Sequence, residues 1–296
     1  MSKELISALE KLRGSGRVTG SALTKRQRCA LDEFARKTAC IQETIAGRGT
    51  VYQVLNEKVL ETHWRQLRPD ERAELPEDLP QRALNVALSR DSKGSHHRHG
   101  LYYLLLKGAG SEVTWSNGLS TLNLSDATRD YGAATLGIRF EDDWTSQQTL
   151  WLVENQNLFD NLDWLPDGTV ASVAYYGGQL SNLLIHWLAK TPRAKKVILF
   201  PDYDGVGLMN YARLRSELTE DCEFWLMRDW SRLLEKYGNP KVWLDNLDSF
   251  EAAYDRLYDG ADQALLQLME TMRKQAMALE QEAIWLTIGE RNHPNG

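Results

Sequence analysis

The feature that most constrains the fold is an apolar run that ends in two aspartates. Residues 195–207 read Lys-Lys-Val-Ile-Leu-Phe-Pro-Asp-Tyr-Asp-Gly-Val-Gly. An apolar run with lysines before it and glycines after it is typical of a buried parallel strand. Side chains two apart on an extended chain point the same way, so we expect Asp202 and Asp204 to project together from the carboxyl end of this strand. Open α/β sheets bind their ligands at that end.

Two carboxylates held this close repel each other unless a proton or a cation lies between them. An Asp-x-Asp pair at a strand end therefore favours a hard divalent cation, with Mg²⁺ the first choice. Gly205 and Gly207 follow directly. Because glycine lacks a Cβ atom, these positions allow a backbone or a phosphate group to approach closely before the next helix begins.

A second acidic strand end lies upstream. The apolar run at residues 149–153 ends in Glu154, and a third run, from residue 170, ends in Gly177 and Gly178. Helical patterns lie between these runs, and a last strand is expected at residues 223–227. Alternation of this kind specifies a parallel sheet with right-handed crossovers. It brings Glu154 to the same edge of the sheet as the two aspartates.

At these residues the sequence resembles the Toprim domain, the metal-binding module of topoisomerases, bacterial primases and several nucleases. The local sequence is more similar still to the JetD subunit of Wadjet anti-plasmid systems. The matching segments cover roughly the C-terminal half of the chain: Glu154-Asn155, Phe159, 164–166, Gly177-Gly178, 202–207 and the Leu-Glu-Gln-Glu sequence at 279–282.

This resemblance implies a fold, an activity and partners. The fold would be α/β, a Toprim domain with a parallel sheet flanked by helices, preceded by an α+β winged-helix region as in the topoisomerase VI A subunit. The activity would be that of a Mg²⁺- or Mn²⁺-dependent endonuclease with Glu154, Asp202 and Asp204 as catalytic and metal-binding residues. Glu282 could add a further carboxylate to the metal cluster. The partners would be double-stranded DNA, a second copy of the chain, and an SMC-like ATPase with its kleisin and accessory winged-helix subunits.

The N-terminal residues favour a winged helix on their own pattern. Two helical stretches precede a predicted β-hairpin at residues 41–55, whose tip is Gly47-Arg48-Gly49. In a winged helix, one helix enters the major groove and the wing touches the DNA backbone. The candidate DNA contacts are Lys25, Arg26, Arg28, Arg48, Gly177, Gly178, Gly205 and Gly207. A small winged helix that docks onto protein is the open alternative.

Charge is distributed unevenly along the chain. Residues 1–50 hold ten Lys or Arg against five Asp or Glu, whereas residues beyond 100 hold 17 against 28. The whole chain therefore has a net charge of −6. A basic N-terminal region on an acidic body is compatible with a nucleic-acid-binding protein of low pI, although a solvated charged surface would give the same numbers.

Length and composition suit a globular protein of two domains and a smaller unit. We expect a winged helix at 1–68, a linker and small α+β unit at 69–145, and the Toprim domain at 146–296. No apolar run approaches eighteen residues, which argues against a transmembrane helix. The three cysteines do not form a close pair, which fits the reducing cytoplasm.

Three further features have competing interpretations. The histidines at 96–99 lie in a Gly/Ser-containing stretch and are expected to form a loop rather than a metal site. Tyr102 and Tyr103 lie in an apolar run, where core packing is expected rather than attack on DNA. A long helix with a continuous apolar stripe from Leu265 to Leu286 is expected to pack on its own domain or to pair with a partner helix.

Two other functions remain open at this stage. One is a winged-helix DNA-binding regulator whose Toprim domain is degenerate. The other is a Toprim nuclease that processes RNA. The sequence contains no Walker A motif, so any use of ATP is expected to lie in partner proteins.

Overall fold

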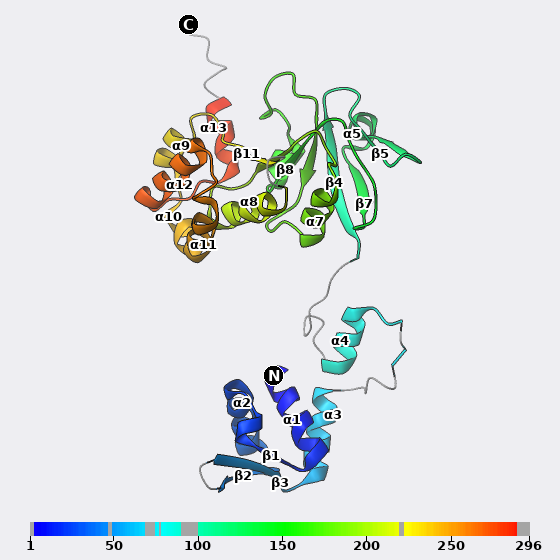
Figure 1. Cartoon of the computed structure of the whole chain (residues 1–296), viewed down its shortest axis with the longest axis vertical. Coiled ribbons are helices and arrows are strands. Elements are labelled where there is room, and N and C mark those ends of the chain that lie inside the picture. Colours follow the sequence, from blue (N-terminus) through cyan, green and yellow to red (C-terminus); the bar gives the residue numbers. More distant parts are fainter. Residues whose placement is uncertain are drawn as a thin grey trace. The chain divides into compact units, whose positions relative to one another are not determined.

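Figure 1 shows the computed structural model of the chain. The structure describes residues 3–46, 49–68, 75, 76, 78–89, 100–218 and 222–288. The chain divides into two compact units, Met1–Arg98 and His99–Gly296. No helix among the described residues is both long and apolar enough to cross a membrane.

The first unit combines helices with a small antiparallel sheet. Strand β1 pairs with β3, which pairs with β2. The β2–β3 pair confirms the predicted hairpin, although Gly47 and Arg48 at its tip lie outside the described residues. The elements of this unit are α1 (Lys3–Ser15), β1 (Arg17–Thr19), the 3-10 turn η1 (Gly20–Ala22), α2 (Lys25–Thr38), β2 (Ile41–Ala46), β3 (Gly49–Val54), α3 (Glu57–Leu67) and α4 (Gln81–Ser89).

Helix α2 begins where the sequence places a capping box. Thr24 Oγ1 accepts a hydrogen bond from the backbone N–H of Gln27, and Gln27 Oε1 accepts one from the N–H of Thr24. These bonds satisfy donors that have no partner inside the helix. Helices α1, α2 and α3 enclose a core of their own that includes Leu9, Leu31 and Trp64.

The second unit is built on a six-stranded mixed sheet. Its strands are β4 (Tyr102–Ala109), β7 (Ala134–Ile138), β8 (Thr149–Val153), β9 (Ala171–Tyr175), β10 (Val197–Phe200) and β11 (Cys222–Phe224), with β5 (Thr114–Ser116) and β6 (Thr121–Asn123) as a separate hairpin. Its helices are α5 (Leu124–Tyr131), α6 (Gln156–Asp160), α7 (Asn182–Lys190), α8 (Gly205–Leu218), α9 (Trp230–Tyr237), α10 (Pro240–Asp245), α11 (Leu247–Leu257), α12 (Gln263–Gln275), the 3-10 turn η4 (Gln281–Ile284) and α13 (Trp285–Ile288).

The strand order is β11-β10-β8-β9-β4-β7. The first four strands are parallel, as expected, whereas β4 runs antiparallel to both β9 and β7. The sheet is therefore mixed. Since β4 and β7 belong to it, the expected boundary at residue 146 differs from that of the structure, where the compact unit begins at His99.

The parallel strands contain a topological switch point. The chain passes from β8 outward to β9, then back across β8 to β10 and on to β11. Right-handed crossovers in opposite directions place α6 on one face of the sheet and α7 and α8 on the other. Strands β8 and β10 are neighbours whose following helices lie on opposite faces, so their carboxyl ends flank a crevice of the kind that binds ligands.

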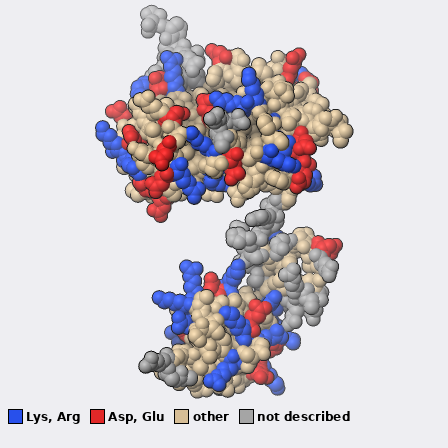
Figure 2. Space-filling model, in the orientation of Figure 1, with Lys and Arg blue, Asp and Glu red and all other residues tan. Residues whose placement is uncertain are grey.

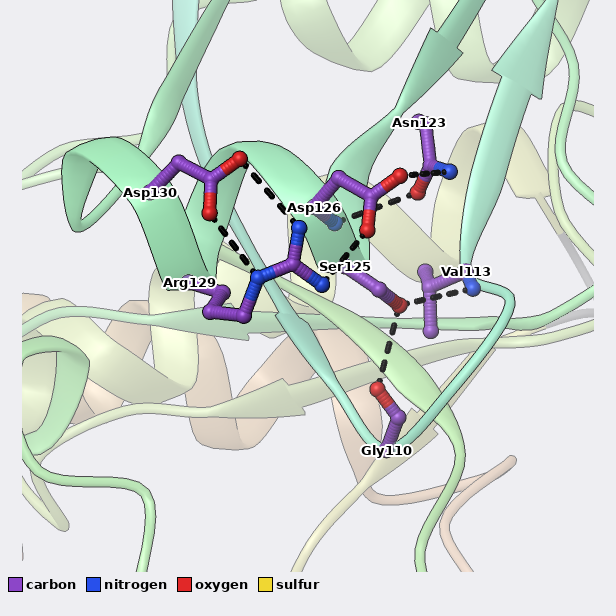
Figure 3. A network of polar contacts seen from close by, with 7 residues as sticks. All are labelled: Gly110, Val113, Asn123, Ser125, Asp126, Arg129 and Asp130. Carbon is purple, nitrogen blue, oxygen red and sulfur yellow. Dashed lines mark hydrogen bonds and ion pairs between the residues drawn. The ribbon is translucent and has the colours of Figure 1, made fainter.

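Helix α5 is held over β4 by the polar contacts of Figure 3. Ser125 Oγ donates to the carbonyl oxygen of Gly110 and accepts from the N–H of Val113. The Asn123 side chain caps α5 by accepting a hydrogen bond from the N–H of Asp126. Arg129 forms ion pairs with Asp126 and Asp130. The Ser125 bonds join α5 to the segment that follows β4, whereas the other contacts lie within the helix and its cap.

Helices α8 and α11 approach each other at Gly205. A Cβ atom there would lie 2.2 Å from the carbonyl oxygen of Asn246 and 2.5 Å from the nitrogen of Phe250. At Gly207 it would lie 2.1 Å from the carbonyl oxygen of Asp202. Both glycines are buried. The expected close approach of backbone is confirmed, but these two positions offer no exposed surface to a DNA phosphate.

The predicted continuous helix from Leu265 to Leu286 is wrong. Helix α12 ends at Gln275, because Ala276 adopts the left-handed conformation with φ 53° and caps the helix. The chain then runs extended and forms a bridge between Leu279 and Tyr203. Leu265, Met269, Met272, Leu279 and Ala283 are buried in the core of the unit. The apolar stripe therefore packs inside its own chain.

Candidate active site

The carboxyl ends of β8 and β10 bring together the acids that the sequence singles out. Glu154 directly follows β8, and its Oε2 atom accepts hydrogen bonds from the Tyr176 hydroxyl (3.1 Å) and from the N–H of Asp202 (3.4 Å). Tyr176 follows β9 and is buried. Glu154 is therefore fixed between the ends of the two strands next to its own.

The C-terminal segment enters the crevice between the same two strands. Gln281 is fully buried, and its side chain donates to the carbonyl oxygen of Phe200 and accepts from the N–H of Asn155 at 2.9 Å. Its backbone N–H donates to Asp202 Oδ1 at 2.8 Å. One residue thus joins the end of β8, the end of β10 and the first aspartate of the Asp-x-Asp pair.

Glu280 and Glu282 flank this glutamine and add negative charge to the crevice. Glu282 Oε1 accepts a hydrogen bond from the side chain of Asn155, the residue after Glu154. Both glutamates act on Asp202 and raise its pKa. The structure therefore places Glu282 beside the other predicted acids, and Glu280 joins them although the sequence did not single it out as a site residue.

The carboxyl groups resist ionisation because they are buried and lie close together. Burial, then the charges of Asp202 and Asp204, raise the pKa of Glu154 to about 8. Burial is also the main cause that raises the pKa of Asp202 to about 7, with Asp204, Glu282 and Glu280 adding to it. Hydrogen bonds from neighbouring donors oppose the shift at both sites. The site as it stands favours bound protons, or a cation in their place.

Asp204 differs from the other acids because both of its oxygens are engaged. Oδ1 accepts from the N–H of Gly207 at 2.8 Å, and Oδ2 accepts from the side chain of Asn246 at 3.1 Å. Its carboxylate therefore satisfies donors at the start of α8, as an N-cap residue does. Burial raises its pKa, and so does the charge of Glu280. A metal-binding role for Asp204 stays a prediction beside this structural one.

The donor set suits a hard divalent cation by its chemistry. Glu154, Asp202 and Glu282 each have one oxygen engaged in hydrogen bonds, and the other accepts none from the described residues. Carboxylate oxygens are the ligands that Mg²⁺ and Mn²⁺ prefer. In the part of the chain that the structure describes, however, no three acidic, histidine or cysteine side chains are gathered closely enough to hold an ion. Side-chain rotation would have to accompany binding.

Gly177 and Gly178 form an exposed turn above this edge. Their φ values are +59° and +72°, a conformation that glycine adopts without strain. The carbonyl oxygen of Gly178 accepts from the side chain of Asn210, and Asn210 Oδ1 accepts from the N–H of Leu180. Because this turn continues from Tyr176, its position is coupled to that of Glu154. Contact with a DNA phosphate stays a prediction.

The predicted basic residues of the first unit lie at the start of α2. Lys25, Arg26 and Arg28 are exposed, and none forms a hydrogen bond or ion pair with the described residues. Positive side chains in the first turn of a helix oppose its dipole, so their charge is not explained by helix stability. Figure 2 shows Lys and Arg side chains prominent on the visible face of this unit.

The remaining predicted residues lie either outside the described residues or away from the β8–β10 crevice. Arg48 and the histidines at 96–99 lie outside the described residues. Tyr102 is half-buried, and burial raises its pKa, whereas Tyr103 is 66% exposed. Both belong to β4, two strands away from β8. Neither bonds to the carboxylates of the β8–β10 crevice.

Sequence reasoning missed the neutral residues that orient the acids. Tyr176, Gln281, Asn246 and Asn210 come from four different segments, and no local pattern marks them. A signal existed only for Gln281, which lies between two glutamates near the end of an otherwise apolar stripe. Its place in the crevice depends on the strand-like bridge of Leu279 with Tyr203.

Comparison with known proteins identifies one family. Residues 103–287, more than half of the chain, match the family described as "Domain of unknown function (DUF7281)". The match begins in β4 and ends in α13, so it spans the mixed sheet and the C-terminal segment that enters the crevice. No curated protein sequence matches this chain.

Proposed function

This chain belongs to the DUF7281 family, whose description assigns no activity, and from its own residues we propose that it is a divalent-metal-dependent endonuclease acting on double-stranded DNA. Residues from β8 onward would form a Toprim-like catalytic domain. The first unit would be a winged helix that contacts DNA.

The observation that carries this proposal is the gathering of carboxylates at the switch point between β8 and β10. Besides burial, the charges of Asp202 and Asp204 raise the pKa of Glu154, and those of Asp204, Glu282 and Glu280 raise the pKa of Asp202. The described groups that bond to these acids are neutral: a tyrosine hydroxyl, amide side chains and backbone N–H groups. Repelling acids without a basic partner, at the ligand-binding edge of a sheet, favour a bound cation.

Mg²⁺ or Mn²⁺ would be held by Asp202, Asp204 and Glu282, with Glu154 either as a fourth ligand or as the general base, and a cation so bound activates a phosphodiester and a water molecule for hydrolysis. The chain's own part is to orient the acids and to move a proton. Tyr176 holds Glu154 through Oε2, which leaves Oε1 free to accept a proton from the attacking water. The water oxygen then bonds to phosphorus as the bond to the 3′ oxygen breaks, and the 3′ oxygen takes up a proton from solvent, which gives a 5′-phosphate and a 3′-hydroxyl.

The resemblance to JetD supports a place for this nuclease in a larger assembly. We include in the proposal an SMC-like ATPase, its kleisin and accessory winged-helix subunits as partners, with plasmid or other foreign circular DNA as the target. We also propose a homodimer, because two sites related by a twofold axis would match the symmetry of a DNA duplex. Leu265, Met269, Met272, Leu279 and Ala283 of the apolar stripe are buried in the chain's own core, so these five residues offer no surface to a dimer.

The test is cleavage of supercoiled plasmid by the purified full-length protein. We expect nicked or linear product with Mg²⁺ or Mn²⁺ and none with EDTA. Asp202→Asn should abolish the product, and Glu154→Gln should lower the rate by about 10²–10⁴-fold, as for loss of a general base. The control is Asp160→Asn, which removes an exposed carboxylate at the end of α6 and should cut as wild type does.

Three outcomes would contradict the proposal. Intact plasmid with tight DNA binding by wild type would identify a regulator with a degenerate site. Equal cleavage by wild type and the Asp202→Asn/Glu154→Gln double variant would show that the β8–β10 crevice is not the catalytic centre. A structured RNA cut in preference to plasmid DNA would identify an RNA-processing enzyme instead.

A further inference from the structure

Two arginines on helices α8 and α11 carry charge that no carboxylate of the described residues balances. Arg213 bonds only to neutral oxygens: the carbonyl oxygen of Leu180 at 2.9 Å, Asn182 Oδ1 at 2.6 Å and Asn210 Oδ1 at 3.2 Å. Arg256 is exposed and has neither a hydrogen bond nor an ion pair with the described residues.

The packing of α8 against α11 brings Arg213 and Arg256 to the same height along the helix pair. Helices α8 and α11 lie side by side, with Gly205 against Asn246 and Phe250 at one end and the side chain of Arg215 bonded to the carbonyl oxygen of Gly260 at the other. Positions some 45 residues apart therefore face each other along the pair, which sets Arg213 close to Arg256. Burial lowers the pKa of Arg213, and the charge of Arg256 lowers it further.

The pair is connected to the carboxylate site through Asn210. This side chain is buried, accepts from Arg213 and donates to the carbonyl oxygen of Gly178. It also lies close enough to Tyr176 to oppose the rise in the pKa of that hydroxyl group, which donates to Glu154. Arg213 thus lies beside the turn that follows Tyr176 at this edge of the sheet.

We propose that Arg213 and Arg256 bind a backbone phosphate of the duplex DNA whose scissile phosphate lies at the β8–β10 crevice. A phosphodiester would relieve the repulsion between the two guanidinium groups, which suit phosphate oxygens as bidentate donors. This contact would position the duplex and read no sequence. The inference rests on the proposed function, since it deepens the account of how the same site holds its substrate.

The experiment measures binding of a labelled short duplex in EDTA over a range of salt concentrations, so that no cleavage occurs. Arg256→Gln should lower the slope of log affinity against log salt by about 0.9, the value for one phosphate contact. Arg256→Lys should restore most of the slope, because the charge is retained. The control is Lys274→Gln, which removes an exposed charge from α12 and should leave the slope unchanged.

Equal slopes for wild type and Arg256→Gln would overturn the inference. So would a change of slope that appears with an RNA duplex and not with DNA. Failure of the proposed function is a separate result. If wild type shows the Arg256-dependent slope but never cuts plasmid, the result supports the phosphate site and contradicts the nuclease function. If wild type cuts plasmid but Arg256→Gln binds DNA with the wild-type salt dependence, the result supports the nuclease function and contradicts the phosphate site.

Discussion

Glu154 illustrates how a single residue can oppose the stability of a fold and still serve a site. Its carboxyl group is held by Tyr176 and by the N–H of Asp202, with other acids nearby. Ionisation of Glu154 therefore costs more free energy in the folded protein than in the unfolded chain, where the carboxyl group is solvated. A cation would reverse the cost, so stability, metal and pH should be coupled at this position.

The first prediction concerns pH and stability. The pKa of Glu154 is raised from 4.5 to about 8 and that of Asp202 from 3.8 to about 7. Because the folded state holds protons that the unfolded state has lost, this stabilising contribution is complete below about pH 4 and disappears as the pH rises to about 8. In EDTA, Tm should therefore decrease over this range by at least about 3 °C, the change that corresponds to about 1 kcal/mol.

Glu154→Gln removes the ionisable group and should weaken this pH dependence. At pH 8 in EDTA its Tm should equal or exceed that of wild type, and Mg²⁺ should stabilise wild type more than the variant. The measurement is a calorimetric or fluorescence melt at each pH. A wild-type Tm that rises steadily from pH 5 to pH 8 would show that these carboxyl groups ionise without penalty.

At the scale of elements, the α8–α11 contact places the Asp-x-Asp turn. Helix α8 begins at Gly205, and the N-terminal ends of both helices meet beside Asp204, which binds the side chain of Asn246. Gly205→Ala would put a methyl group onto the backbone of α11. We expect a loss of about 1–3 kcal/mol or more in the free energy of unfolding, as for overpacking.

Gly14→Ala is the matched control for this substitution. Gly14 lies in α1, and nothing lies within 4 Å of the position of its missing Cβ atom. Alanine should stabilise that helix by about 0.5–1 kcal/mol. Urea unfolding of both variants measures the difference. Equal stability of Gly205→Ala and wild type would mean that the two helices can separate freely.

The C-terminal segment is the second element that shapes the site. Gln281→Glu keeps the size of the side chain but replaces the amide donor to Phe200 with an oxygen, and it adds a charge near Asp202. We expect a loss of about 1–3 kcal/mol from the unpaired carbonyl group. We also expect weaker cleavage that recovers in part at higher Mg²⁺ concentration.

Gln267→Glu is the control for this substitution, since Gln267 is exposed on α12. It should leave both the melt and the metal titration unchanged. The two readouts separate a positioning role from a purely structural one. If Gln281→Glu only lowers Tm and cuts with the wild-type dependence on Mg²⁺, Gln281 stabilises the fold without orienting Asp202.

At the scale of the whole molecule, the two units would divide the work of binding and cutting. Alanine at Lys25, Arg26 and Arg28 removes three positive charges at the start of α2 that form no ion pair with the described residues. If each contacts a phosphate, the slope of log affinity against log salt should decrease by about 2.7. Binding of a short duplex by the full-length chain in EDTA provides the measurement.

The control replaces Lys37, Lys58 and Arg65 with alanine. It removes the same formal charge from the same unit, but Lys37 and Arg65 are already paired with glutamates. The slope of log affinity against log salt for this variant should change by less than about 0.9, the value for one phosphate contact. Equal slopes for the two triple variants would show that α2 does not meet the DNA backbone, as a docking role would require.

Local patterns in the sequence were sufficient for several elements. The predicted hairpin at 41–55 became β2 and β3, and the apolar run at 197–200 became β10. Glu154 and Asp202 were placed at one edge of a sheet because parallel strands joined by helices must end on the same side. These are consequences of near neighbours in the chain, so they can be predicted without the tertiary structure.

Contacts between distant segments were decided only by the fold. The stripe beyond Ala276 breaks because Leu279 pairs with Tyr203, and that pairing carries Gln281 into the β8–β10 crevice. The same argument applies to β4, whose place in the sheet depends on its antiparallel pairing with β9. Periodicity along the chain records which side chains are buried. It holds no information on the distant backbone against which they are buried, and that partner determines how the carboxylates are arranged.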